Sequence, residues 1–245
     1  MGNLVTGPLG PAARRRALEH AASSIVALTA PVFEHLHRMA DTASRLQLDE
    51  ATATGVIPYP NVDLLEQAAV AAIRGVKLIT GAGMAAISEQ HLNVGVMNWW
   101  ILRGSDVVSK RHVLNPRSDS YYDFSHSRWF QVPAESGRPT LIAPYVDSWG
   151  TDDLTITAAV PSPNSAAGIT TIVAADLDVR AYIQQVEELI WPARPAALID
   201  SEQRAVASTV PEIETGVRLS STDIWAVEDR IDLVDLGWSL VLLTR

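Results

Sequence analysis

The sequence predicts an α+β protein in which a long N-terminal helix packs on an antiparallel sheet and a smaller second β-unit follows. Three observations support this prediction. Residues 12–48 carry apolar side chains with a helical period, residues 78–177 are rich in short β-type runs, and a further set of short runs follows "WPARP" at residues 191–195. We therefore expect a helical segment over 1–77, a domain built on the antiparallel sheet over 78–190 and a second unit over 191–245.

The N-terminal helix is predicted by apolar residues whose spacing alternates between four and three, with a break or kink near Pro31. A helix of this length also offers a surface on which two copies of the chain could form a homodimer. A loop over 49–61 and a second helix beginning near Asn61 are expected to follow. The apolar stripe consists of Leu18, Ala22, Ile25, Thr29, Val32, Leu36, Met39, Ala43 and Leu46.

Short apolar runs predict the strands of the first sheet. The run at 153–161 alternates between apolar residues and Thr155 and Thr157, which is typical of a sheet with one covered face. The segment "SPNSAAG" predicts a hairpin turn, and 177–190 has a helical pattern. The expected strands cover 78–87, 94–104, 107–114, 140–147, 153–161 and 167–177.

Composition restricts the possible partners. The formal charge of -9 and the pI near 5.1 argue against a general affinity for nucleic acid or anionic lipid, because both require clustered basic residues. We interpret the one short basic run, Arg14 to Arg16, as a solvated helix start.

Membrane and redox signals are also missing from the sequence. There is no cysteine, which excludes disulfides and thiolate chemistry. The chain has no long apolar run and its first residues lack the apolar stretch of a secretory signal. We therefore expect a cytoplasmic protein without a membrane segment.

The residues give little support to an enzyme. The six histidines are scattered, and His35 and His37 point to different sides of a helix, so no metal site is predicted. No G-x-S-x-G motif is present. We expect no catalytic activity, cofactor or metal, and a hydrolase using His126, Asp147 and Asp176 remains the alternative.

Two segments combine aromatic and acidic residues: "YYDFSHSRWF" at 121–130, which we interpret as a loop, and "PYVD" at 144–147. Carboxylates accept hydrogen bonds from an ammonium group, and the faces of aromatic rings attract its charge. These residue types therefore favour recognition of a small organic cation. The alternative is a structural interaction module whose rings form the core and whose acids cap turns.

The order "YYDFSHSRWFQVP…GR…APYVDSWGTDDLTITAAVP…GITTIVAADLD" resembles the double-Cache, PAS-like family of sensor domains. The resemblance implies a long helix leading into a PAS-like sheet, and a smaller second unit. Within the family, the chain resembles soluble actinobacterial members that pair with, or are encoded beside, helix-turn-helix regulators. The resemblance therefore implies a helix-turn-helix regulator on another chain as a possible partner.

The resemblance also implies a binding site. Tyr122, Trp129 and Phe130 match residues on the carboxylate side of an amino-acid ligand. Ser127 stands where the family has an arginine, and Arg128 follows it. Without that arginine a ligand carboxylate lacks its bidentate partner, so an amine is favoured over an amino acid unless Arg128 turns into the pocket. The ammonium side matches Tyr145, Asp147 and Asp176.

Overall fold

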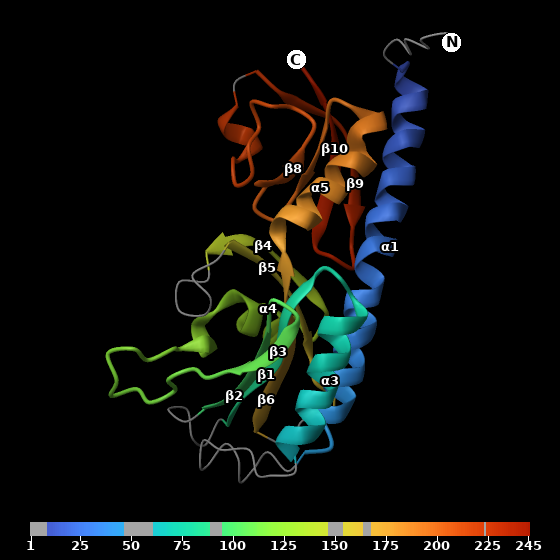
Figure 1. Ribbon diagram of the computed structural model, residues 1–245. Coiled ribbons are helices and arrows are strands. Elements are labelled where there is room, and N and C mark those ends of the chain that lie inside the picture. The colour runs from blue at the N-terminus through green and yellow to red at the C-terminus, as the bar shows by residue number, and fades with distance from the viewer. Residues whose placement is uncertain (1–8, 47–60, 89–94, 147–153, 164–167, 223) are drawn as a thin grey trace. The chain divides into compact units, whose positions relative to one another are not determined.

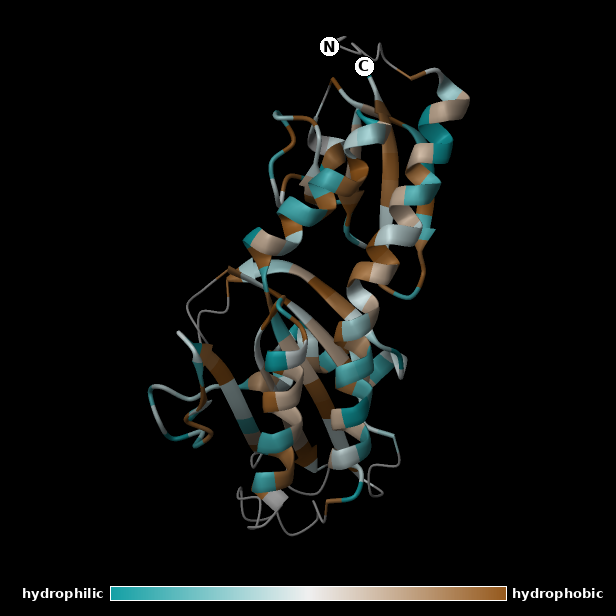
Figure 2. Ribbon diagram, turned by 45° about the vertical axis from the view of Figure 1, so that its right-hand side comes forward, coloured by the Kyte–Doolittle hydropathy of each residue, from teal (hydrophilic) through white to brown (hydrophobic). Residues whose placement is uncertain are grey.

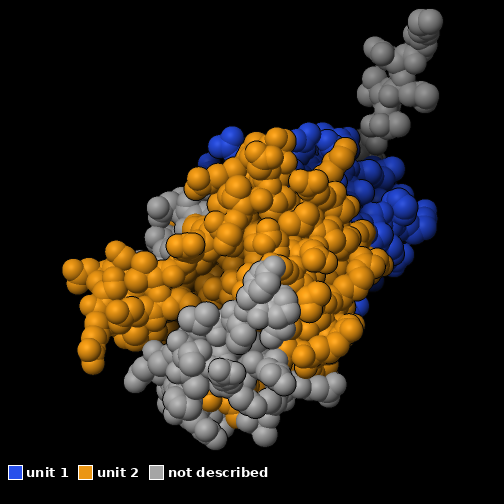
Figure 3. Space-filling model, turned by 60° about the horizontal axis from the view of Figure 1, so that its bottom comes forward, with its two compact units in different colours: residues 1–29, 180–245 blue, residues 30–179 orange. Residues whose placement is uncertain are grey.

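The computed structural model describes residues 9–46, 61–88, 95–146, 154–163, 168–222 and 224–245. The chain forms two compact units, one from residues 1–29 with 180–245 and one from residues 30–179 (Figure 1; Figure 3). In both units hydrophobic residues are concentrated along the strands, and hydrophilic residues mark the outer faces of the helices (Figure 2).

The predicted N-terminal helix is confirmed as α1 (Pro11–Ala43). The expected break is wrong, since the helix continues through Pro31. Pro31 is exposed, so water can hydrate the carbonyl that loses its N–H partner there. The apolar stripe from Leu18 to Ala43 is buried as expected, whereas Leu46 lies beyond the end of the helix and is half-buried.

The interpretation of the basic run as a solvated helix start is wrong for Arg14, whose side chain is only 15% exposed. Its guanidinium donates to the carbonyls of Pro195 and Leu243 at 3.2 and 3.1 Å, and to Glu228 at 2.8 Å. The neighbouring Arg15 pairs with Asp229. The first turns of α1 are therefore held to the sheet of the first unit by hydrogen bonds.

That sheet has four strands in the order β8-β7-β10-β9, and it confirms the predicted second β-unit. Tyr182 of the preceding helix packs edge-on against Trp238, with ring centroids 6.1 Å apart. The elements are α5 (Val179–Ile190), η3 (Trp191–Ala193), β7 (Ala196–Ile199), β8 (Ala205–Ser208), η4 (Leu219–Ser221), β9 (Ala226–Leu233) and β10 (Trp238–Thr244).

The second unit contains the six predicted strands, all antiparallel, in the order β3-β2-β1-β6-β5-β4. This arrangement confirms the predicted α+β fold with a PAS-like sheet. The strands are β1 (Ile79–Ser88), β2 (Gly95–Arg103), β3 (Asp106–Lys110), β4 (Thr140–Val146), β5 (Leu154–Pro161) and β6 (Ile169–Asp178). The strands β5 and β6 pair as the expected hairpin.

Helices cover both faces of this sheet (Figure 1). The C-terminal half of α1 lies beside α3 (Asn61–Gly75) on one face. The 3-10 helix η2 (Phe124–His126) and the helix α4 (Arg128–Ser136) lie on the other. Residues 124–136 are therefore largely helical, which corrects the interpretation of 121–130 as a loop. No helix within the described ranges is long and apolar enough to cross a membrane.

Coverage of both faces also corrects the expectation for β5. The alternation of threonine with apolar residues predicted one solvated face, yet Thr155 and Thr157 are both buried. The Thr157 hydroxyl is accommodated because it is hydrogen-bonded to Asp176 on β6. A polar residue in this strand thus marks a buried polar contact and not a solvent-facing position.

Candidate ligand-binding site

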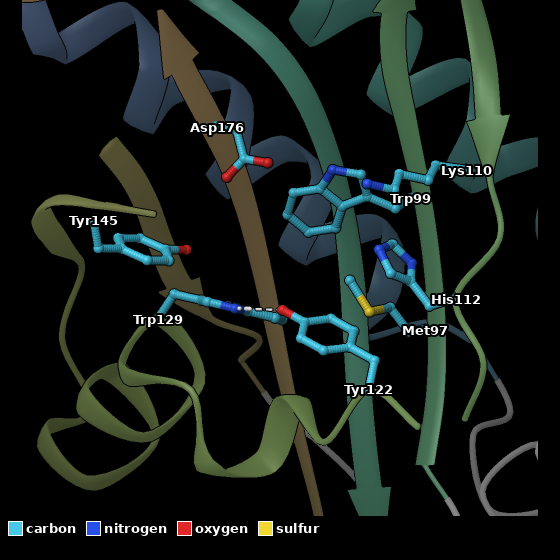
Figure 4. Close-up of a pocket in the computed structure, with 8 residues that line it drawn as sticks. All are labelled: Met97, Trp99, Lys110, His112, Tyr122, Trp129, Tyr145 and Asp176. Atoms are coloured by element: carbon cyan, nitrogen blue, oxygen red, sulfur yellow. Dashed lines mark hydrogen bonds between the residues drawn. The ribbon is translucent and has the colours of Figure 1, made fainter. Parts of the chain in front are cut away.

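A pocket lies in the second unit, between the six-stranded sheet and the segment that contains η2 and α4 (Figure 4). Its residues come from four strands, from α4 and from the segment between β3 and η2. The pocket is lined by Met97, Trp99, Lys110, His112, Tyr122, Trp129, Tyr145 and Asp176.

Two glycines of β1 make room for the indole of Trp99. A Cβ atom at Gly83 would lie 2.6 Å from Trp99 Cε3, and one at Gly81 would lie 3.0 Å from Trp99 Nε1. Gly83 pairs with Trp99 on the neighbouring strand, so the absent side chain leaves space next to the ring. The sequence "GAG" therefore lets the indole lie across the sheet as one surface of the pocket.

An aromatic wall faces Trp99. The Trp129 ring centroid is 5.8 Å from that of Trp99, and Trp129 Nε1 donates a 3.2 Å hydrogen bond to the Tyr122 hydroxyl. Phe124 and Phe130 lie behind this wall, with centroids 6.3 and 5.9 Å from that of Trp129. Tyr122 and Trp129 are buried, so the wall is held by the core and not by solvent-exposed contacts.

The acidic side of the pocket is Asp176, which is only 7% exposed. Its Oδ1 accepts a 2.8 Å hydrogen bond from Thr157 Oγ1. The Tyr145 hydroxyl lies 2.9 Å from the same Thr157 oxygen. Since the single hydroxyl proton of Thr157 goes to Asp176, Tyr145 must donate to Thr157. A chain of hydrogen bonds thus fixes the carboxylate at the pocket.

The basic side is formed by Lys110 and His112. Lys110 pairs with Trp99 across β3 and β2, so both side chains lie on the same face of the sheet. The His112 ring lies 5.0 Å from the Tyr122 ring, centroid to centroid. Burial lowers the pKa of His112 to about 4, and the charge of Lys110 adds to the effect. The imidazole is therefore neutral near pH 7.

The pocket is narrow. The cavity has a volume of about 10 Å³, which is room for about one water. A larger molecule can enter only if the lining side chains move outward. A rearrangement of these side chains must therefore accompany the binding of any organic ligand.

The structure places four of the seven predicted site residues at the pocket: Tyr122, Trp129, Tyr145 and Asp176. Phe130 is buried behind the aromatic wall. Arg128 is exposed at the start of α4 and does not line the pocket. Asp147 lies outside the described residues.

Sequence reasoning missed Met97, Trp99, Lys110, His112 and Thr157. Alternation along β2 does place Met97 and Trp99 on one face. The signal that was lacking is strand register, because only the pairing of Lys110 with Trp99 shows that β3 turns its lysine toward the same face.

The alternative hydrolase site lacks its base. The His126 side chain is 79% exposed, and its Nδ1 lies 2.8 Å from Asp123 Oδ2. It does not line the pocket that contains Asp176. Within the described part of the chain, no group of three or more His, Cys, Asp or Glu could hold a metal ion.

Comparison with solved structures identifies the fold. The ligand-binding domain of the Pseudomonas aeruginosa PAO1 amino acid chemoreceptor PctB, in complex with L-Gln, is 16% identical with a TM-score of 0.61, covering 95% of this chain and 89% of that one. Methyl-accepting Chemotaxis protein X is 13% identical with a TM-score of 0.61, covering 93% and 94%. The extracellular domain of mmHK1S-Z3, described as a histidine kinase, is 12% identical with a TM-score of 0.60, covering 96% and 95%.

No family model and no curated protein matches the sequence. The structural matches nevertheless span both units of the chain. The protein therefore has the fold of the ligand-binding domains of chemoreceptors and sensor kinases. More particularly, it has the two-unit, PAS-like fold that the resemblance to double-Cache sensor domains predicted.

Proposed function

We propose that this chain is a sensor domain that binds a small amine or amino acid in the pocket between the six-stranded sheet and α4, and that it signals through a separate partner. The observation that carries the proposal is the placement of Asp176: a buried carboxylate lines a pocket whose other walls include Trp99, Tyr122, Trp129 and Tyr145. An ammonium group can donate hydrogen bonds to the carboxylate and is attracted by the faces of the aromatic rings.

The energetics favour a cationic group beside Asp176. Burial of a carboxylate is costly unless it is paired and hydrogen-bonded, and Thr157 donates a hydrogen bond to Asp176 Oδ1. The ammonium group of a ligand can add a charge-assisted hydrogen bond to the same carboxylate, while the aromatic faces attract its charge.

The structural neighbours support the same class of ligand. PctB was solved in complexes with L-Arg and L-Gln, and PctC, at a TM-score of 0.55, in complex with GABA. Each of these ligands carries an ammonium and a carboxylate group. Because the identities are 13–16%, the support comes from the shared fold, and the residues of this pocket must carry the argument for this chain.

A thermal-shift screen of the full chain tests the proposal. The ligands are the common L-amino acids, 4-aminobutyrate and the amines obtained from them by removing the carboxylate. A specific ligand at 100 times its Kd stabilises the folded state by about 2.7 kcal/mol. If no member of either set raises the unfolding temperature, the proposed function is wrong.

Three further parts of the proposal come from the sequence. The homodimer through α1 is proposed from the length of that helix, the cytoplasmic location from the lack of a long apolar run, and the helix-turn-helix regulator on a partner chain from the resemblance. The mmHK1S-Z3 domain is extracellular, so location needs its own test: fractionation of cells that express the protein with its native flanking sequence. Recovery in the cytoplasm supports the proposed location, and recovery with the membrane or outside the cell contradicts it.

A further inference from the structure

We propose that Lys110 and His112 form the carboxylate-binding side of this pocket, so that its ligand is a zwitterionic amino acid and not a simple amine. This inference rests on the proposed function and specifies the class of ligand. It reverses the preference for an amine that the sequence suggested from Ser127. Ser127 stands where the family has an arginine, and Lys110 at the end of β3 supplies a positive charge in its place.

Lys110 is placed to act in this way. It lies directly opposite Trp99 in the β2–β3 ladder, and Trp99 faces the pocket. Figure 4 shows the ammonium end of Lys110 beside the Trp99 indole, on the side that faces the cavity. No acidic side chain among the described residues forms an ion pair with Lys110. Its charge is therefore available to a ligand.

His112 adds a second polar group on the same side of the pocket (Figure 4). Its Nδ1 is buried and has no hydrogen-bond partner within the described ranges. A buried polar atom without a partner costs free energy, which a ligand can recover by forming the missing bond. The neutral ring can carry its proton on Nδ1 and donate it to a carboxylate oxygen.

Lys110 and Asp176 line the same pocket but lie on strands that are not neighbours in the sheet. Between β3, which carries Lys110, and β6, which carries Asp176, lie β2 and β1. Three inter-strand spacings amount to about 14 Å between the backbones. Lys110 and Asp176 do not pair with each other. A ligand that carries both an ammonium and a carboxylate group can pair with both, because the side chains of Lys110 and Asp176 span part of this distance.

Charge then decides between the ligand classes. A monoamine pairs with Asp176 but leaves Lys110 without an anion. A diamine brings its second positive charge toward Lys110, and like charges at close range repel. Only a zwitterion satisfies both sides. A hydrogen bond between charged groups contributes about 1.5–3 kcal/mol, so we expect at least about a 10-fold preference for an amino acid over the corresponding amine.

Isothermal titration calorimetry with matched ligand pairs tests the inference. The pairs are L-norvaline with butylamine, L-arginine with agmatine, and 4-aminobutyrate with propylamine, since each amine lacks only the carboxylate. The variants of the full chain are Lys110→Met, which removes the charge, Lys110→Arg, which keeps it, and Lys77→Met. Lys77 is the other lysine of the chain and is exposed, so it is a matched control.

We expect the unmodified chain and Lys77→Met to bind at least one amino acid about 10-fold or more tightly than its amine. Lys110→Met reduces this ratio to about 1 by weakening the amino acid alone, and Lys110→Arg restores the preference. An equal ratio in the unmodified chain and in Lys110→Met overturns the inference but leaves the proposed function intact, because the amine still binds. Failure of every ligand to bind the unmodified chain overturns both. An unchanged unfolding temperature of free Lys110→Met shows that lost affinity is not lost folding.

Discussion

Thr157 and Asp176 face each other in the β5–β6 ladder, and Thr157 Oγ1 donates a 2.8 Å hydrogen bond to Asp176 Oδ1. The same hydroxyl oxygen accepts a bond from Tyr145, at 2.9 Å. One small side chain thus connects an aromatic residue of the pocket with its carboxylate. Because Thr157 is completely buried, no solvent can replace either bond when the hydroxyl is removed.

We therefore expect Thr157→Val to reduce the free energy of unfolding by about 1–3 kcal/mol, since valine keeps the shape but leaves polar partners without their bonds. Thr157→Ser keeps the hydroxyl and is the control. Urea unfolding followed by circular dichroism measures both variants. If the valine variant is as stable as the serine variant, the hydrogen bonds of Thr157 do not hold the site together.

Gly83→Ala tests the space beside Trp99. The added Cβ would lie 2.6 Å from Trp99 Cε3 and 2.2 Å from the Asn98 carbonyl oxygen, distances that force the neighbours to move. Overpacking of this kind costs about 1–3 kcal/mol. Near-ultraviolet circular dichroism should show a changed indole environment, together with a lower unfolding temperature.

The control for this prediction is Gly10→Ala, because no atom lies within 4 Å of a Cβ built there. Its spectrum and unfolding temperature should match those of the unmodified chain. A normal indole spectrum in Gly83→Ala would contradict the role that the structure gives to the missing side chain.

Arg14→Lys tests the attachment of α1 within the first unit. A lysine ammonium cannot reproduce the guanidinium contacts with two carbonyls and Glu228 at once. We expect a loss of about 1 kcal/mol or more, which lowers the unfolding temperature of a chain of this size by about 2–4 °C per kcal/mol. Arg16→Lys is the matched control, and an equal effect of both variants would show that Arg14 acts only through its charge.

His112 predicts a pH dependence of stability. Its pKa in the folded state is about 4, below the unperturbed value of 6.5, because burial and Lys110 disfavour its charged form. Between these pH values the unfolded chain binds more protons, so the contribution of His112 to stability is lost as pH falls from about 6.5 to about 4. The depression corresponds to at most about 3 kcal/mol.

His112→Gln removes this titration. Lys110 is the charged group that contributes to the lowered pKa of His112, and Tyr122 packs against the ring. No carboxylate of the described residues contributes to that shift. We expect the stability of the unmodified chain relative to His112→Gln to fall by up to about 3 kcal/mol between pH 7 and pH 4. Urea unfolding at several pH values measures it, and a difference that does not vary with pH would place His112 in solvent.

The architecture could be predicted because it depends on local periodicity. The helical stripe from Leu18 to Ala43 predicts the helix, and the β-type runs predict the strands. The resemblance implied how these elements are arranged into a sheet and a second unit. The break expected near Pro31 is absent because an exposed proline can remain inside a long helix that packs on both sides of it, whereas the alternative of a kink stays a prediction. The domain boundaries after residues 77 and 190 stay predictions.

The sequence could predict the site residues that belong to local motifs, but not those that strand pairing brings to the pocket. Tyr122 and Trp129 lie within one short segment of the chain, and Tyr145 and Asp176 belong to recognisable motifs. Lys110 and His112 gave no local signal, because a lysine in an edge strand is common and only strand register turns it toward Trp99. The position of Lys110 relative to Asp176 depends on the strand order and register of the sheet, which the sequence does not give directly.

The most direct test of the central claim is the affinity of Asp176→Asn for an ammonium ligand. Asparagine keeps the shape and an acceptor for Thr157 but loses the charge, so folding should change little. Isothermal titration calorimetry with the tightest ligand of the three matched pairs should show a loss of at least about 100-fold, while Asp106→Asn, at an exposed site on β3, binds normally. Equal affinities of Asp176→Asn and the unmodified chain would contradict the claim that this pocket recognises an ammonium group.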